Sequence, residues 1–145
     1  MTIMDYLTMH RKLQHSYETK CCPVIKKYGI NQSDFDVMMF LGNNPEHNTA
    51  KDICQIRDIK SGIVSVTVER LCQMGMLERL PDASDRRIQR LVLTQKTHDI
   101  VQDVRKIQKN YVKELFRDID PDKLKIYQEI VQQITHNAER IEEKE

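Results

Sequence analysis

Residues 60–94 read KSGIVSVTVERLCQMGMLERLPDASDRRIQRLVLT, and this stretch decides the fold. Its first part predicts an amphipathic helix, because apolar side chains recur on one side at helical spacing: Val64, Val68, Leu71 and Cys72. We expect Gly75 to end this helix as a residue in the left-handed conformation just beyond it. The alternating residues Met76–Leu80 then predict a strand.

A charged turn and a second strand follow. Pro81–Asp85 has the composition of a turn. Three arginines give the hairpin a positive charge: Arg86, Arg87 and Arg90. A helix followed by a hairpin with a basic tip is typical of a winged helix-turn-helix, a fold that reads a DNA duplex. The fold class that we predict is therefore mainly α with a small β-hairpin, with long helices at both ends of the chain.

The residues before this stretch predict three helices. The first runs from Met4 to Tyr28, and we expect a kink or a break at Pro23 because proline lacks a backbone donor. The second begins at Ser33 with Asp36 three residues on, a variant of the capping box. Thr49 caps the third, whose inward-facing residues we expect to be Ala50, Ile53, Cys54 and Ile56.

Two helices follow the hairpin, one from about Gln95 to Arg117 and one that begins with Asp120 and Pro121. A helix of about 23 to 25 residues is roughly 35 to 38 Å long, longer than a small domain is wide. The apolar stripes of the terminal helices would then overhang the centre, and a second copy of the chain would cover them. A twofold homodimer also suits a palindromic DNA site.

The length of the chain favours one domain over residues 1–145. Within it we expect a DNA-binding lobe at 33–94 and a helical dimerisation region at 1–29 and 95–145. The composition, 39% hydrophobic and 31% charged, is that of a soluble protein. No apolar run is long enough for a membrane span, and the first residues lack a signal-peptide layout, so we expect a cytoplasmic protein with no membrane partner.

The net charge is +1, but residues 49–96 hold nine Lys/Arg against six Asp/Glu. The positive charge therefore lies where a duplex would bind.

Several short motifs resemble those of the multiple-antibiotic-resistance regulator (MarR) family of bacterial transcription factors. They are TAKDI at 49–53, KSGIVS at 60–65, the L-x-x-x-G pair Leu71 and Gly75, and the series Asp85, Arg87, Leu91, Leu93 and Thr94. The resemblance implies a homodimer whose recognition helices lie in successive major grooves while the wings reach the minor grooves. It also implies repression of a gene that is relieved by a small phenolic or other effector, or by oxidation.

The expected DNA contacts come from two places. The recognition helix offers Lys60, Ser61, Gly62, Ser65, Val66 and Arg70, and the wing offers Asp85, Arg86, Arg87 and Arg90. A guanidinium at the wing tip suits the narrow minor groove, and Asp85 could hold Arg87 in position. The alternative for the wing arginines is ordinary solvated charge. Val66 departs from the arginine that many members carry, and an apolar side chain there could touch a thymine methyl group; Arg86 departs from a common acidic residue.

The resemblance also implies an effector pocket between the first, second and fifth helices and the DNA-binding lobe. Candidate lining residues are His10, His15, Tyr17, Tyr28 and Met38, although aromatic and Met residues at helical spacing also suit a core.

The four cysteines suit a reducing compartment, and passive thiols are favoured. In peroxide-sensing relatives the reactive cysteine lies near where Leu7 stands here, so the alternative of a thiol-redox-responsive regulator would use Cys21 or Cys22. A second alternative is a winged-helix protein-interaction module that does not bind DNA. The histidines show no metal-site spacing, and no catalytic or phosphate-binding motif is present, so we expect neither a cofactor or metal nor an enzyme.

Overall fold

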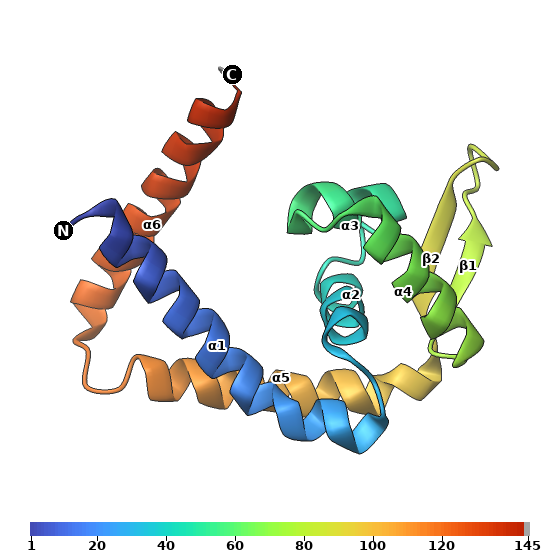
Figure 1. The fold of residues 1–145 in the computed structure, drawn as a ribbon, viewed down its shortest axis with the longest axis horizontal. Coiled ribbons are helices and arrows are strands. Elements are labelled where there is room, and N and C mark those ends of the chain that lie inside the picture. The colour runs from blue at the N-terminus through green and yellow to red at the C-terminus, as the bar shows by residue number, and fades with distance from the viewer. Residues whose placement is uncertain (144–145) are drawn as a thin grey trace. The chain divides into compact units, whose positions relative to one another are not determined.

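The computed structural model describes residues 1–143, so the last two residues of the predicted range 95–145 lie outside the described residues. Figure 1 shows the helices and the hairpin, whose order is α1 (Ile3–Tyr28), α2 (Gln32–Asn43), α3 (Ala50–Arg57), α4 (Ser61–Gln73), β1 (Leu77–Pro81), β2 (Gln89–Leu93), η1 (Gln95–Thr97), α5 (His98–Leu115) and α6 (Pro121–Glu142). The predicted class, mainly helical with a small antiparallel hairpin, is confirmed. The chain divides into two compact units, residues 1–108 and the residues from Lys109 onward.

Helix α1 is longer and more continuous than predicted. It begins one residue before Met4, where Thr2 and Asp5 form a capping box: the Asp5 N–H donates to Thr2 Oγ1 at 3.3 Å, and the Thr2 N–H donates to the Asp5 carboxylate at 2.7 Å. Of the expected kink or break at Pro23, the break is wrong, since the helix continues to Tyr28, and the kink stays a prediction. Proline removes one hydrogen bond, and the burial of Cys21 and Val24 around it holds the helix in place.

Helix α2 begins earlier than predicted. Its N-cap is Asn31, whose Oδ1 accepts from the Asp34 N–H at 2.8 Å, while the Asp34 carboxylate accepts from the Asn31 N–H at 3.0 Å. The predicted start at Ser33 is therefore wrong by two residues, because asparagine is as good an N-cap as serine and its Asp34 partner stands at the required spacing. Helix α2 then supplies most of the core of the lobe, including Phe35 and Met38.

Helix α3 begins as predicted. Thr49 is the N-cap, and Thr49 and Asp52 form a reciprocal capping box. Ile53 is fully buried and Cys54 partly so, but Ala50 and Ile56 are exposed, so the prediction that these two turn inward is wrong. A helix of only eight residues packed on one side buries a single narrow stripe.

Helix α4 packs against α2 and α3 through Val64, Thr67, Val68 and Leu71, all buried. Gly75 follows it with φ of +69°, and the Met76 N–H donates to the Leu71 carbonyl at 2.9 Å, as the C-terminal glycine motif requires. Strands β1 and β2 pair antiparallel in the register Leu77 with Leu93 through Pro81 with Gln89. Figure 1 shows the hairpin beside α4, consistent with the contacts between α4 and β1.

The second unit contains the end of α5 and helix α6. Asp120 caps α6 by accepting from the N–H groups of Asp122 and Lys123, and Pro121 opens its first turn, as predicted. The rings of Phe116 and Tyr127 lie 6.4 Å apart, centroid to centroid. No residue of α6 is buried. Among residues 1–143, no helix combines the length and the apolar character that crossing a membrane requires.

Candidate nucleic-acid interface

The outer side of α4 has the exposure that a recognition helix needs. Ser61, Gly62 and Ser65 are exposed, and the Val66 side chain is 71% exposed. Lys60 is exposed and occupies the N-cap position, where it makes no side-chain capping hydrogen bond. The predicted recognition residues, apart from Arg70, therefore share one accessible stretch of the chain.

Arg70 is engaged inside the lobe. Its Nε donates to Asp34 Oδ1 at 3.1 Å and its Nη2 to Asp34 Oδ2 at 2.6 Å, while the Asp34 side chain is 1% exposed. A two-pronged guanidinium–carboxylate pair is among the strongest polar contacts in proteins. The guanidinium compensates a buried charge and ties α4 to the start of α2, so the phosphate contact of Arg70, which stays a prediction, would share the guanidinium with Asp34.

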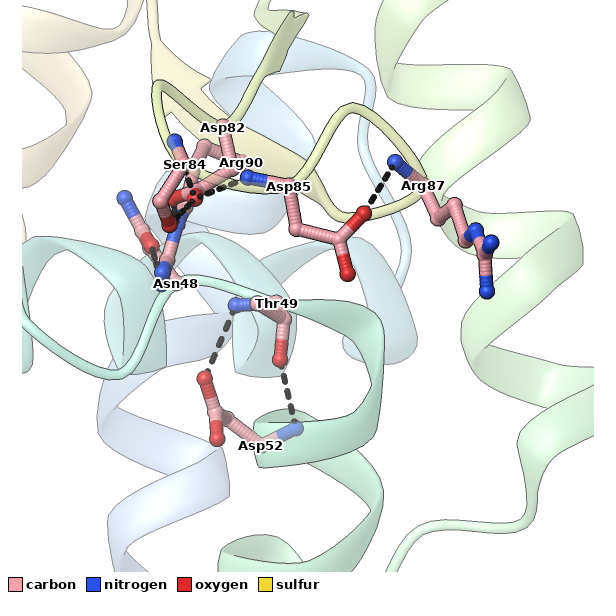
Figure 2. A network of polar contacts seen from close by, with 8 residues as sticks. All are labelled: Asn48, Thr49, Asp52, Asp82, Ser84, Asp85, Arg87 and Arg90. Atoms are coloured by element: carbon pink, nitrogen blue, oxygen red, sulfur yellow. Dashed lines mark hydrogen bonds and ion pairs between the residues drawn. The ribbon is translucent and has the colours of Figure 1, made fainter.

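The wing turn is organised by one carboxylate, shown in Figure 2. Asp82 Oδ2 accepts from the Ser84 N–H at 3.0 Å, from Ser84 Oγ at 2.6 Å and from the Asp85 N–H at 3.1 Å. Its Oδ1 accepts from Arg90 Nε at 2.7 Å. The hydrogen bonds from Ser84 and Arg90 hold the pKa of Asp82 well below its usual range.

Arg90 links the wing to the start of α3. Besides its bond to Asp82, its Nη1 donates to Asn48 Oδ1 at 3.1 Å, and the neighbouring Leu91 N–H donates to the Asn48 carbonyl at 2.7 Å. The alternative of plain solvated charge for Arg90 is therefore wrong, because two side chains of this protein hold its guanidinium, and the phosphate contact stays a prediction (Figure 2). Sequence reasoning missed Asn48, which carries no motif of its own.

Arg86 and Arg87 remain at the exposed tip. Within residues 1–143 neither guanidinium takes part in an ion pair. The expectation that Asp85 holds the Arg87 side chain is wrong: Asp85 Oδ1 accepts from the Arg87 backbone N–H at 2.9 Å, and Figure 2 shows the guanidinium directed away from Asp85. The carboxylate shapes the backbone of the turn and leaves the side chain extended.

Comparison with known proteins agrees with this geometry. The family model that matches is that of the MarR family, over residues 28–88, which include α2, α3, α4 and the wing turn. Over these residues the lobe is similar to proteins of the MarR family. Among curated proteins no match was found.

Solved structures of MarR-family and related regulators share the whole fold. The transcriptional regulator PA3341 has a TM-score of 0.82 at 20% identity, over 93% of this chain and 98% of that chain. Bordetella bronchiseptica BpsR, described in connection with regulation of its DNA binding by 6-hydroxynicotinic acid, has a TM-score of 0.69 at 16% identity, over 90% and 98% of the two chains. A mutant of S. aureus MepR bound to an oligodeoxyribonucleotide has a TM-score of 0.58 at 16% identity, over 92% and 97%.

The five predicted effector residues have different surroundings: Tyr17 and Tyr28 pack against the core that contains Met38, whereas the two histidines lie on the surface. His10 and His15 are exposed, and Met38 is fully buried in the core. Tyr28 donates its hydroxyl to Asp103 at 2.9 Å, and Tyr17 accepts from Gln108 Nε2 at 2.7 Å. Burial raises the pKa of Tyr17 to about 12. Two surface hollows of the described chain are lined by other residues, between Leu93 and Arg105 and between Asn110 and Arg117.

The four cysteines of this chain are free thiols. Cys21 is completely buried, and burial raises its pKa, so the thiol stays protonated and unreactive at neutral pH. Cys22, Cys54 and Cys72 are partly exposed. Within residues 1–143 no group of three or more His, Cys, Asp or Glu side chains is placed to hold a metal ion.

Proposed function

We propose that this protein is a dimeric, sequence-specific DNA-binding regulator of transcription of the MarR family that acts in the cytoplasm. One observation carries the proposal: the wing tip presents Arg86 and Arg87 on a turn that the Asp82–Arg90–Asn48 contacts attach to the same lobe as α4. A fixed wing and an exposed recognition helix on one rigid lobe suit simultaneous contact with the minor and the major groove. The related MepR structure, solved with an oligonucleotide, has this fold.

In this proposal residues 33–94 bind DNA, and the helical residues 1–29 and 95–145 form the dimer. The apolar side chains that α6 leaves exposed support it: Ile126, Tyr127, Ile130, Val131, Ile134 and Ile141. An apolar face of this extent on a helix of 22 residues favours a partner over water. A second copy related by a twofold axis places two recognition helices on a palindromic operator.

The regulator is proposed to be a repressor that a small-molecule effector releases. The support is the family itself and BpsR, whose DNA binding is described as regulated by 6-hydroxynicotinic acid. An effector that bound the hydroxyl of Tyr17 or Tyr28 would share or replace the contact with Gln108 or Asp103.

The test is selection from a pool of random-sequence duplexes at low salt, followed by a measurement of the mass of the selected complex. The proposal expects retention of duplexes with a twofold-symmetric consensus and two chains in each complex. Failure to retain any duplex would contradict the DNA-binding function and favour a protein-interaction module. Retention of one chain per duplex would contradict the dimer.

A further inference from the structure

The DNA-facing side of α4 has an unusual composition. Residues 61–69, SGIVSVTVE, contain no Lys, Arg, Asn or Gln. These four residue types make the two-pronged contacts that identify guanine and adenine in the major groove. The N-terminal part of a recognition helix is the part that reaches base edges in helix-turn-helix proteins. Apart from Lys60 at the N-cap, this part of the helix therefore has to read bases by other means.

Glu69, the charged residue of this stretch, is already engaged. Glu69 Oε2 accepts from Arg79 Nη2 at 2.9 Å, and Glu69 Oε1 accepts from Gln73 Nε2 at 3.2 Å. Arg79 lowers the pKa of Glu69, so the group is a carboxylate that cannot donate a hydrogen bond. Glu69 thus binds both Gln73 and Arg79 at the C-terminal half of the helix.

The exposed remainder is small or apolar. Val66 is 71% exposed and Ile63, three residues earlier and hence on the same side, is 47% exposed. Ser61, Gly62 and Ser65 surround them. Valine and isoleucine at the centre of a surface that faces a duplex lose water on binding, and the one apolar group that a base offers in the major groove is the C5-methyl group of thymine.

We propose that Val66, assisted by Ile63, determines sequence specificity by contacting thymine methyl groups, so that the operator is recognised through the placing of its thymines. This inference rests on the DNA-binding function proposed above and names what that site prefers. Ser61 and Ser65 hydroxyls add hydrogen bonds that suit any base, so the discriminating contact is the apolar one.

The experiment uses the full chain and the duplexes selected from the random pool. Each thymine of the consensus is replaced in turn by deoxyuracil, which removes the 5-methyl group and keeps the base pairing. We expect each half-site to contain at least one thymine whose replacement weakens binding by about fourfold. This factor corresponds to the transfer free energy of one buried methyl group. In Val66→Ala the same replacement has a smaller effect, because the two γ-methyl groups that touched the thymine methyl group are gone while Ile63 remains.

Val92→Ala is the matched control, because it shortens another exposed valine of the same lobe, on β2 outside the recognition helix. It is expected to keep the wild-type preference for thymine over deoxyuracil. Val66 is on the surface, so its replacement leaves the fold intact, which thermal unfolding verifies. Duplex binding without any preference for thymine over deoxyuracil, or a preference that Val66→Ala leaves undiminished, would overturn this inference alone. Absence of duplex binding would overturn the proposed function and the inference with it.

Discussion

The contact between Arg70 and Asp34 gives the sharpest prediction about stability. The Asp34 side chain is 1% exposed and accepts three hydrogen bonds, from the Asn31 N–H and from two nitrogens of Arg70. The Arg70 side chain is 43% exposed. Removing the arginine leaves a buried carboxylate with one donor out of three, whereas removing the charge of Asp34 leaves a guanidinium that can turn toward water.

The two substitutions should therefore have unequal effects. Arg70→Met removes two charge-assisted hydrogen bonds of about 1.5 kcal/mol each, and breaking a buried pair costs about 3 to 5 kcal/mol; the exposure of the arginine places the loss near the lower figure, about 3 kcal/mol. Asp34→Asn keeps a side chain of the same shape and should cost about 1 kcal/mol. Against a total stability of roughly 5 to 15 kcal/mol, the first loss is large.

The assay is equilibrium unfolding in urea, which does not screen charges, at one fixed protein concentration so that any association contributes equally. Wild type, both single variants and the double variant complete a cycle. The double variant should be more stable than Arg70→Met, because the uncompensated charge is absent. Equal losses for the two single variants, or a loss below about 1 kcal/mol for Arg70→Met, would refute the role assigned to the pair.

Three further predictions concern single residues. Gly62→Ala should stabilise the protein by about 0.5 kcal/mol in urea unfolding, because an added Cβ meets nothing within 4 Å, and should weaken duplex binding because the methyl group lies on the DNA-facing side; a loss of stability would contradict this. Iodoacetamide at pH 8 should label Cys22 before Cys21, whose pKa is raised by burial; mass spectrometry that finds Cys21 labelled first would argue against inert burial. The pKa of Asp82 is lowered in the folded state, so the stability that it contributes is present above the unfolded value of about 3.9 and is lost as the pH falls through the folded pKa. The difference in unfolding free energy between wild type and Asp82→Asn should thus stay constant from about pH 5 to 7 and shrink below about pH 4, and an unchanged difference at low pH would contradict it.

The local parts of the fold could be predicted because their determinants are close in sequence. Thr49 and Asp52 stand three residues apart, and the conformation of Gly75 depends on its immediate neighbours. The N-cap of α3 and the end of α4 can therefore be predicted from residue spacing. The start of α2 was misplaced because Asn31 with Asp34 and Ser33 with Asp36 offer the same spacing. Only packing of the helix decides between two such caps.

The candidate site was harder to predict, since the decisive partners are distant in the chain. Arg70 is hydrogen-bonded to Asp34 and Arg90 to Asn48, and each pair joins elements that meet through tertiary packing. The hydropathy pattern identifies an arginine as exposed but cannot identify which carboxylate lies beneath it. Val66 was predictable because a single residue on the outer face of an amphipathic helix needs no partner to be exposed.

The central claim, that the wing and α4 bind a duplex, is tested most directly by the salt dependence of binding. Log K for a selected duplex is plotted against log salt for wild type, for Arg87→Gln and for Lys26→Gln, an exposed lysine of α1 outside the proposed DNA-binding face. We predict a steep negative slope that becomes shallower by roughly 1 for each Arg87→Gln chain and is unchanged in Lys26→Gln. A flat dependence in the wild type, or a slope that Arg87→Gln leaves unaltered, would contradict the account.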